Sequence, residues 1–88
     1  MMKIQRTERF KEAFKNLDLK IRKKFEKALS LFFINPYHPS LHTKKIHGRE
    51  NIWEVRVDIH YRFTFNLTDK GVYRLRNIDN HDECLKNP

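Results

Sequence analysis

Two arginines in the second half of the chain have the spacing of a phosphate-binding pair. Arg56 and Arg62 stand six positions apart, in two stretches that alternate apolar and polar residues around a short turn. On adjacent antiparallel strands, both side chains would lie on the same open face of the sheet. Two guanidinium groups that converge there can bind a phosphate and stabilise charge that develops on it. Two solvated strand arginines, paired with Glu54 or Asp58, fit the pattern equally well.

The residue best suited to proton transfer is His81, which follows the last expected strand within a polar run. Histidine is the side chain that most readily both gives and takes a proton near neutral pH. The alternation along the preceding strands places Glu54 and His60 on the face that carries the two arginines. A surface histidine that caps the tail is the simpler explanation of His81, and the pattern alone favours it.

Three further histidines, His38, His42 and His47, raise the question of a metal site. Their spacing puts no two of them on one helix face, and neither cysteines nor a carboxylate set accompanies them, so we expect no metal and no cofactor. Lys44 and Lys45 lie among them and are better suited to contact a phosphate backbone. The chain also has no glycine-rich phosphate loop and no paired acidic metal site, which argues against kinases, P-loop enzymes and metal nucleases.

The elements that would position these residues follow from a change in hydrophobic period. Up to Phe32, apolar residues recur every three or four positions, which predicts a helical hairpin with N-caps at Thr7 and Asp18 and an end at Asn35-Pro36. Residues 53–60, 61–67 and 72–78 alternate with a period of two and predict strands, with a turn at 69–71 and a short edge strand around Ile4. The polar tail 79–88 is expected to lie over the sheet or to fray. The fold class is therefore α+β: one domain, residues 1–88, with the hairpin packed on one face of a small antiparallel sheet in the order β-α-α-β-β-β.

Charge and cysteine content limit the classes of function. The 88 residues include 19 Lys and Arg against 11 Asp and Glu, a formal net charge of +8, which favours a polyanionic partner, nucleic acid first. Cys84 is the only cysteine, so no intramolecular disulfide can form, as is usual in the reducing cytosol. We see no signal peptide and no membrane span, and we expect a cytoplasmic protein that does not bind membranes.

The sequence from 53 to 65 strongly resembles the RelE/ParE toxin superfamily. Members share an aromatic residue, an arginine three positions later and a Tyr-Arg pair that opens the next strand, which correspond here to Trp53, Arg56 and Tyr61-Arg62. The upstream segment 41–48 is similar to the Leu…Lys-Leu-x-Gly segment of the family, and 78–83 is similar to its closing segment. With the N-terminal strand and helical hairpin, the resemblance covers nearly the whole chain.

The resemblance implies the toxin of a type II toxin–antitoxin pair. Its RelE-like branch cuts mRNA on the ribosome without a metal, by attack of the ribose 2′-hydroxyl on the neighbouring phosphate, and this is the function that we favour. Its ParE-like branch instead inhibits DNA gyrase, and a non-catalytic RNA-binding relative is a further alternative. The implied partners are mRNA on the ribosome and an acidic, partly disordered antitoxin, with no small-molecule cofactor.

The resemblance also implies roles for individual residues. Arg62 would hold the scissile phosphate with support from Arg56, and His81 would act as general acid or base. The complementary base would be Glu54 or His60, between which the sequence does not choose. The residues expected to grip the RNA backbone are Lys44, Lys45 and His47.

Overall fold

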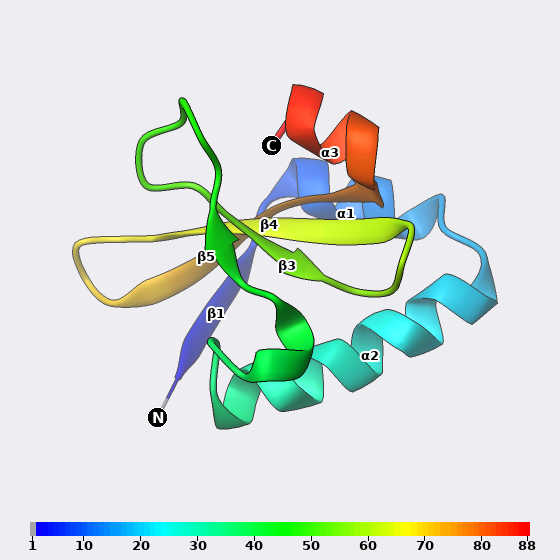
Figure 1. The fold of residues 1–88 in the computed structure, drawn as a ribbon, viewed down its shortest axis with the longest axis horizontal. Coiled ribbons are helices and arrows are strands. Elements are labelled where there is room, and N and C mark those ends of the chain that lie inside the picture. Colours follow the sequence, from blue (N-terminus) through cyan, green and yellow to red (C-terminus); the bar gives the residue numbers. More distant parts are fainter. Residues whose placement is uncertain (1) are drawn as a thin grey trace.

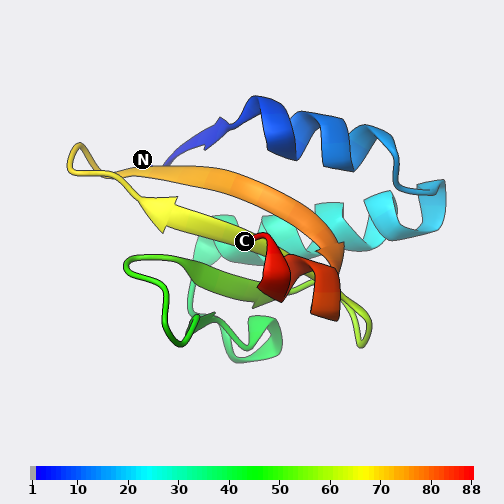
Figure 2. The same ribbon diagram turned by 90° about the horizontal axis from the view of Figure 1, so that it is seen from above.

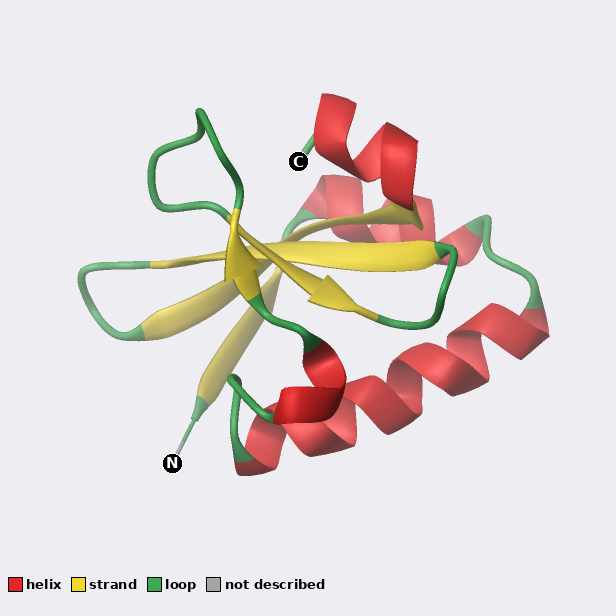
Figure 3. Ribbon diagram, viewed as in Figure 1, coloured by secondary structure: helices red, strands yellow, loops and turns green. Residues whose placement is uncertain are grey.

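The computed structural model describes residues 2–88 as a layered α+β fold (Figures 1 and 3). A five-stranded sheet has the strand order β1-β5-β4-β3-β2. In chain order, the elements are β1 (Lys3–Arg6), α1 (Glu8–Lys15), α2 (Leu19–Ile34), a 3-10 turn (Pro39–Leu41), β2 (Lys44–Lys45), β3 (Trp53–Arg56), β4 (Tyr61–Leu67), β5 (Val72–Asn80) and α3 (His81–Lys86). The predicted fold class is confirmed, and within residues 2–88 no helix has the length and apolarity needed to cross a membrane.

Side-chain caps define the helical hairpin. The hydroxyl of Thr7 accepts a hydrogen bond from the backbone N–H of Phe10 at 3.1 Å, and the carboxylate of Asp18 accepts one from Ile21 at 3.0 Å. Each cap satisfies a backbone donor that has no partner inside its helix. α2 ends at Ile34, directly before the Asn35-Pro36 pair. Both predicted caps and the predicted end are confirmed.

Aromatic side chains fill the space between α2 and one face of the sheet. Phe25 and Phe32 of α2 meet the ring of Phe63 edge-on, at centroid distances of 5.4 and 5.5 Å. Phe32 also packs against Phe65, and these phenylalanines are almost completely buried. Edge-to-face pairs of this kind add to the stabilisation that apolar burial provides. α3 lies on the opposite side of the sheet from α2 (Figures 1 and 2).

The structure differs from the predicted architecture at several places. The edge strand β1 pairs in parallel with β5, so the sheet is mixed instead of purely antiparallel. β3 ends at Arg56, because the backbone N–H groups of Val57 and Asp58 both bond to the carbonyl of Tyr61 and start a turn there. The connector, residues 35–51, contains the two-residue strand β2. The tail lies over the sheet, which was one of the two expectations for it, but most of it forms the helix α3.

Candidate active site

Two rows of side chains cross the sheet on the face that turns away from α2. Arg56 on β3 and Arg62 on β4 are directly opposed Cα partners, as their spacing predicted. One row further along the strands, Glu54 is the Cα partner of both Thr64 on β4 and Lys44 on β2. Because directly opposed residues point to the same side of a sheet, five side chains from three strands converge on one face.

The turn between β3 and β4 holds the guanidinium of Arg62. Nη1 donates to the carbonyl oxygens of Asp58 at 2.6 Å and Tyr61 at 2.9 Å. The carboxylate of Asp58 in turn accepts the backbone N–H groups of His60 and Tyr61 at 2.8 and 2.7 Å and pairs with the ammonium of Lys24 at 3.1 Å. Burial alone would raise the pKa of Asp58, but these hydrogen bonds and Lys24 outweigh it, and the net pKa is lowered. Arg62 is therefore oriented through one nitrogen, which leaves donors for a ligand.

Glu54 is a buried carboxylate in the middle of the site, with 4% of its surface exposed. Its one ion-pair partner among residues 2–88 is Lys44, with Nζ 3.7 Å from Oε1, and the Lys44 side chain is largely exposed. Buried carboxylates are uncommon unless they are paired or serve a function. Glu54 is thus a candidate for proton transfer on structural grounds as well.

α3 delivers His81 to the same place. Asn80 caps the helix by accepting the N–H of Glu83, and the backbone N–H of His81 donates to the carbonyl of His60 at 2.7 Å. The Nδ1 atom of His81 is buried and has no hydrogen-bond partner within residues 2–88. Further along α3, the thiol of Cys84 donates to the carbonyl of Arg62 at 3.2 Å, and burial raises the pKa of this thiol to about 12. The helix is therefore attached to β4, which carries Arg62, and to the turn that precedes it.

These residues line two adjoining hollows. We call the first the arginine pocket, and its lining residues are His42, Thr43, Lys44, Glu54, Arg56, Arg62 and His81. We call the second the α3 groove, which runs between β2 and α3 and is lined by Lys44, Lys45, Ile46, His47, Glu54, His81 and Leu85. The hollows share three residues, so one leads into the other. The arginine pocket holds three cationic side chains against one carboxylate, a balance suited to a phosphodiester.

The structure brings most of the predicted site residues together. Five of them line the arginine pocket: Lys44, Glu54, Arg56, Arg62 and His81. Lys45 and His47 line the α3 groove. His60 lines neither hollow, since it stands exposed in the turn and meets His81 through its backbone carbonyl. Sequence reasoning missed Thr43 and His42 as pocket residues. The available signal was that both residues directly precede two lysines. The left-handed backbone of His42, φ 47°, which follows the 3-10 turn, could not be predicted from that position.

Residues 2–88 contain no cluster of three or more His, Cys, Asp or Glu side chains placed to hold a metal ion. The three connector histidines are spread apart by the fold. His38 caps the 3-10 turn through its ring nitrogen, His42 lines the arginine pocket and His47 lines the α3 groove.

The fold has clear structural relatives. Over 94% of this chain and 97% of the other, it is similar to YafQ from E. coli strain BL21(DE3), with a TM-score of 0.76 and 14% sequence identity. The YoeB/ParE toxin from Agrobacterium tumefaciens gives a TM-score of 0.73 at 15% identity, over 91% and 99% of the two chains. The intact E. coli RelBE toxin–antitoxin complex gives 0.69 at 16% identity, over 89% and 94%. No family model and no curated protein matches the sequence. The protein therefore has the fold of the RelE/ParE toxin superfamily, which the motifs of its sequence indicated.

Proposed function

We propose that this protein is the toxin of a type II toxin–antitoxin system and cuts mRNA on the ribosome without a metal ion. The observation that carries the proposal is the arginine pocket, in which two directly opposed arginines, a buried carboxylate and a histidine line one hollow. The fold, shared with proteins described as toxins, supports the same conclusion. Fold alone does not determine the reaction, so our preference for the RelE-like branch rests on the chemistry of the pocket.

The proposed reaction is an internal transesterification of RNA. The ribose 2′-oxygen bonds to the adjacent phosphorus, its proton passes to a base, the P–O5′ bond breaks, and the leaving 5′-oxygen takes a proton from an acid. The products are a 2′,3′-cyclic phosphate and a 5′-hydroxyl. The pentacoordinate phosphate carries extra negative charge, which Arg56 and Arg62 stabilise from the strand face.

Glu54 and His81 are the proton-transfer pair in this proposal. Both line the arginine pocket, whereas His60, the other candidate base, does not. We assign the carboxylate of Glu54 as the base for the 2′-hydroxyl and His81 as the acid for the 5′-oxygen. Lys44 binds the phosphate backbone beside them, and Lys45 and His47 do so along the α3 groove.

A protein that cuts the mRNA of its own cell needs a partner that blocks it. We therefore propose an antitoxin as the physiological partner, in keeping with the antitoxin complexes known for E. coli RelE and YafQ. The net charge of +8 favours an acidic partner. An antitoxin that covers apolar surface would also stabilise this small domain by mass action.

Primer extension on cellular mRNA, after induction of the chain without a partner, tests the proposal. We expect new cuts within translated codons for the wild type and for Lys20→Gln, an exposed substitution on α2. Arg62→Ala and His81→Gln should lose at least about 100-fold in cleavage, the usual contribution of a positioned proton donor or charge stabiliser.

Three results would count against the proposal. Growth arrest with intact mRNA and DNA damage would indicate a gyrase inhibitor of the ParE-like branch. Full cleavage by both variants would show that the arginine pocket is not the active site. Binding of RNA without any cleavage would instead indicate a non-catalytic relative.

A further inference from the structure

A second group of arginines lies at the far end of the α3 groove, outside the arginine pocket. We call Arg9, Arg49, Arg74 and Arg76 the arginine cluster. They come from α1, from the loop between β2 and β3, and from β5. None of the four is in an ion pair with an Asp or Glu side chain anywhere in residues 2–88.

The cluster gathers around one short segment of backbone. Arg9 donates to the carbonyl of Asn87, Nη2 of Arg49 donates to the carbonyl of Lys86 at 3.4 Å, and Nε of Arg76 donates to Pro88 O at 3.1 Å. Three guanidinium groups therefore converge on three consecutive residues. A guanidinium has five N–H donors, so each arginine keeps most of its donors free for another acceptor.

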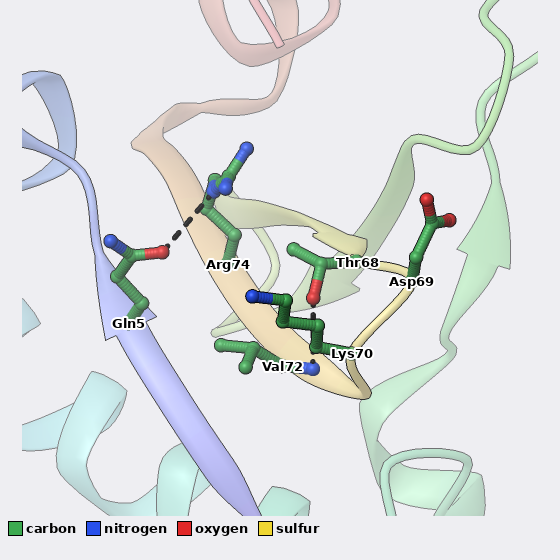
Figure 4. A pocket seen from close by; sticks show the side chains of 6 residues that line it. All are labelled: Gln5, Thr68, Asp69, Lys70, Val72 and Arg74. Atoms are coloured by element: carbon green, nitrogen blue, oxygen red, sulfur yellow. Dashed lines mark hydrogen bonds between the residues drawn. The ribbon is translucent and has the colours of Figure 1, made fainter.

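Arg74 extends the cluster along β5. Its Nε donates to the side chain of Gln5 on β1 at 3.3 Å, and the rest of the guanidinium points away from the β4–β5 turn (Figure 4). Burial first, and then the positive charges of Arg9, Arg74 and Arg49, lower the pKa of Arg76. The positive charges of the other three arginines therefore act on Arg76, and no carboxylate side chain of residues 2–88 forms an ion pair with any of the four.

The α3 groove joins this cluster to the arginine pocket. The groove is lined by His81 at one end of α3 and by Leu85 near the other, and the next residue, Lys86, is the one that Arg49 contacts. Lys45 and His47 lie along its other wall. A flexible polyanion that leaves the arginine pocket along this groove therefore arrives at the arginine cluster.

We infer that the arginine cluster is a second phosphate-binding site, which holds the RNA strand on one side of the cut after the strand has passed through the α3 groove. The ligand class is single-stranded RNA, bound through its phosphates and not through its bases. This inference rests on the proposed function in one respect, namely that the bound strand is RNA.

The test is binding of 2′-O-methyl RNA, which cannot be cut by its own 2′-oxygen, at several salt concentrations. The probes are a 4-nucleotide and a 12-nucleotide single strand, and the variants are Arg49→Gln/Arg74→Gln, Arg49→Lys/Arg74→Lys and the control Lys20→Gln/Lys23→Gln. Lys20 and Lys23 are exposed on α2, on the other side of the sheet, so the control removes the same charge elsewhere.

For the longer probe, we expect the cluster glutamine variant to lose about tenfold in affinity at low salt. Its slope of log affinity against log salt should fall by about 1.4, the counterions of two phosphate contacts on a single strand. The short probe should lose much less, the lysine variant should keep most of the salt slope, and the control should bind like the wild type. Circular dichroism and the urea midpoint confirm that the variants remain folded.

Equal losses for both probes, or losses no larger than those of the control, would overturn the inference. Unchanged RNA binding together with weaker binding of polyglutamate would also overturn it, because the cluster would then dock an acidic protein. The probe cannot be cleaved, so this result is independent of the proposed nuclease activity. Wild type that binds the long probe through the cluster but never cuts mRNA would refute only the proposed function.

Discussion

Removal of the Asp58 carboxylate should loosen the turn that orients Arg62. Asp58 accepts two backbone N–H groups at 2.8 and 2.7 Å and one ammonium at 3.1 Å, while its own carbonyl accepts Nη1 of Arg62. Water can replace part of these contacts in Asp58→Ala, because the turn lies at the surface. We therefore expect a loss of about 1–3 kcal/mol in the free energy of unfolding, the range for a lost charged acceptor or cap.

Asp58→Asn separates the contribution of the two backbone hydrogen bonds from that of the ion pair with Lys24. The amide oxygen still accepts both backbone N–H groups, so the variant loses mainly the ion pair with Lys24, whose side chain is 42% exposed. Such a pair contributes about 0–1 kcal/mol. Lys24→Gln removes the same pair from the other side, and the double variant should cost no more than either single one.

Acid should abolish the difference between wild type and Asp58→Asn. The pKa of Asp58 is lower in the folded protein than its ordinary value of 3.8, so its contribution is present above pH 3.8 and is lost as the pH falls through the lowered pKa. Urea unfolding, followed by the fluorescence of Trp53 at pH 7 and at pH 3 and below, measures both effects. An Asp58→Ala cost no greater than that of Asp58→Asn would refute the role of the two backbone hydrogen bonds.

Three other substitutions or reactions test parts of the structure. Cys84, with its pKa raised to about 12 by burial, should react with a thiol reagent at pH 8 only as fast as the protein opens, and urea should restore rapid labelling. Thr64→Val removes the donor to Pro88 O at 2.9 Å and should cost about 1–2 kcal/mol in urea unfolding, whereas an unchanged midpoint would mean that Arg76 suffices to hold that oxygen. Gly71→Ala should cost about 1 kcal/mol because φ is 80°, although within residues 2–88 nothing beyond the adjacent residues lies within 4 Å of the added methyl group; a neutral result would show that the turn relaxes.

The pairing of β3 with β4 was predictable because one turn fixes every pair. Trp53 opposes Phe65, Val55 opposes Phe63 and Arg56 opposes Arg62, all centred on Ile59. Alternation then decides which side chains face α2, and Arg56 and Arg62 lie on the opposite face. Within this pair of strands, simple alternation failed only at the turn. The turn begins where the N–H groups of Val57 and Asp58 bond to the carbonyl of Tyr61, and the carboxylate of Asp58 holds it through two further N–H groups, as aspartate often does in turns.

The start of α3 also left a signal in the sequence. Asn80 followed three positions later by Glu83 is the pattern of a capped helix N-terminus, and the Asn80 side chain does accept the Glu83 N–H. The position of α3 over the sheet could not be deduced in this way. It depends on a β-bulge: Thr64 pairs with Asn77 and the next residue, Phe65, pairs with Leu75, so the intervening residue of β5 has no partner.

That bulge explains how the segment after α3 is anchored. The extra residue is Arg76, and both Arg76 and Asn77 donate to this segment, to Pro88 O at 3.1 Å and to the Asn87 carbonyl at 2.8 Å. In a regular strand, two consecutive side chains would point to opposite faces. Sequence patterns do not reveal such an irregularity, because it arises from contacts between residues far apart in the chain.

Three polar side chains on this face are buried, and they differ in the number and strength of their polar contacts. Thr64 and Asn77 donate to the segment after α3, so their burial is explained by the anchoring of that helix. Glu54 has only Lys44, at 3.7 Å, and no hydrogen bond from another side chain in the part of the chain that the structure describes. A buried carboxylate with one weak partner does not stabilise a fold, and residues of this kind are characteristic of active sites.

Glu54→Gln therefore separates stability from activity. The neutral amide keeps the shape and removes the cost of a buried charge, so the free energy of unfolding should stay within about 1 kcal/mol of the wild type or rise. Cleavage of mRNA should nevertheless fall at least about 100-fold, because the base for the 2′-hydroxyl is gone. Lys44→Gln is the control for stability alone, since it also breaks the ion pair but leaves the carboxylate in place, whereas its cleavage should fall because Lys44 binds the phosphate backbone. A Glu54→Gln protein that is markedly destabilised and still cuts mRNA would make Glu54 a structural residue and leave His81 as the only proton-transfer candidate in the pocket.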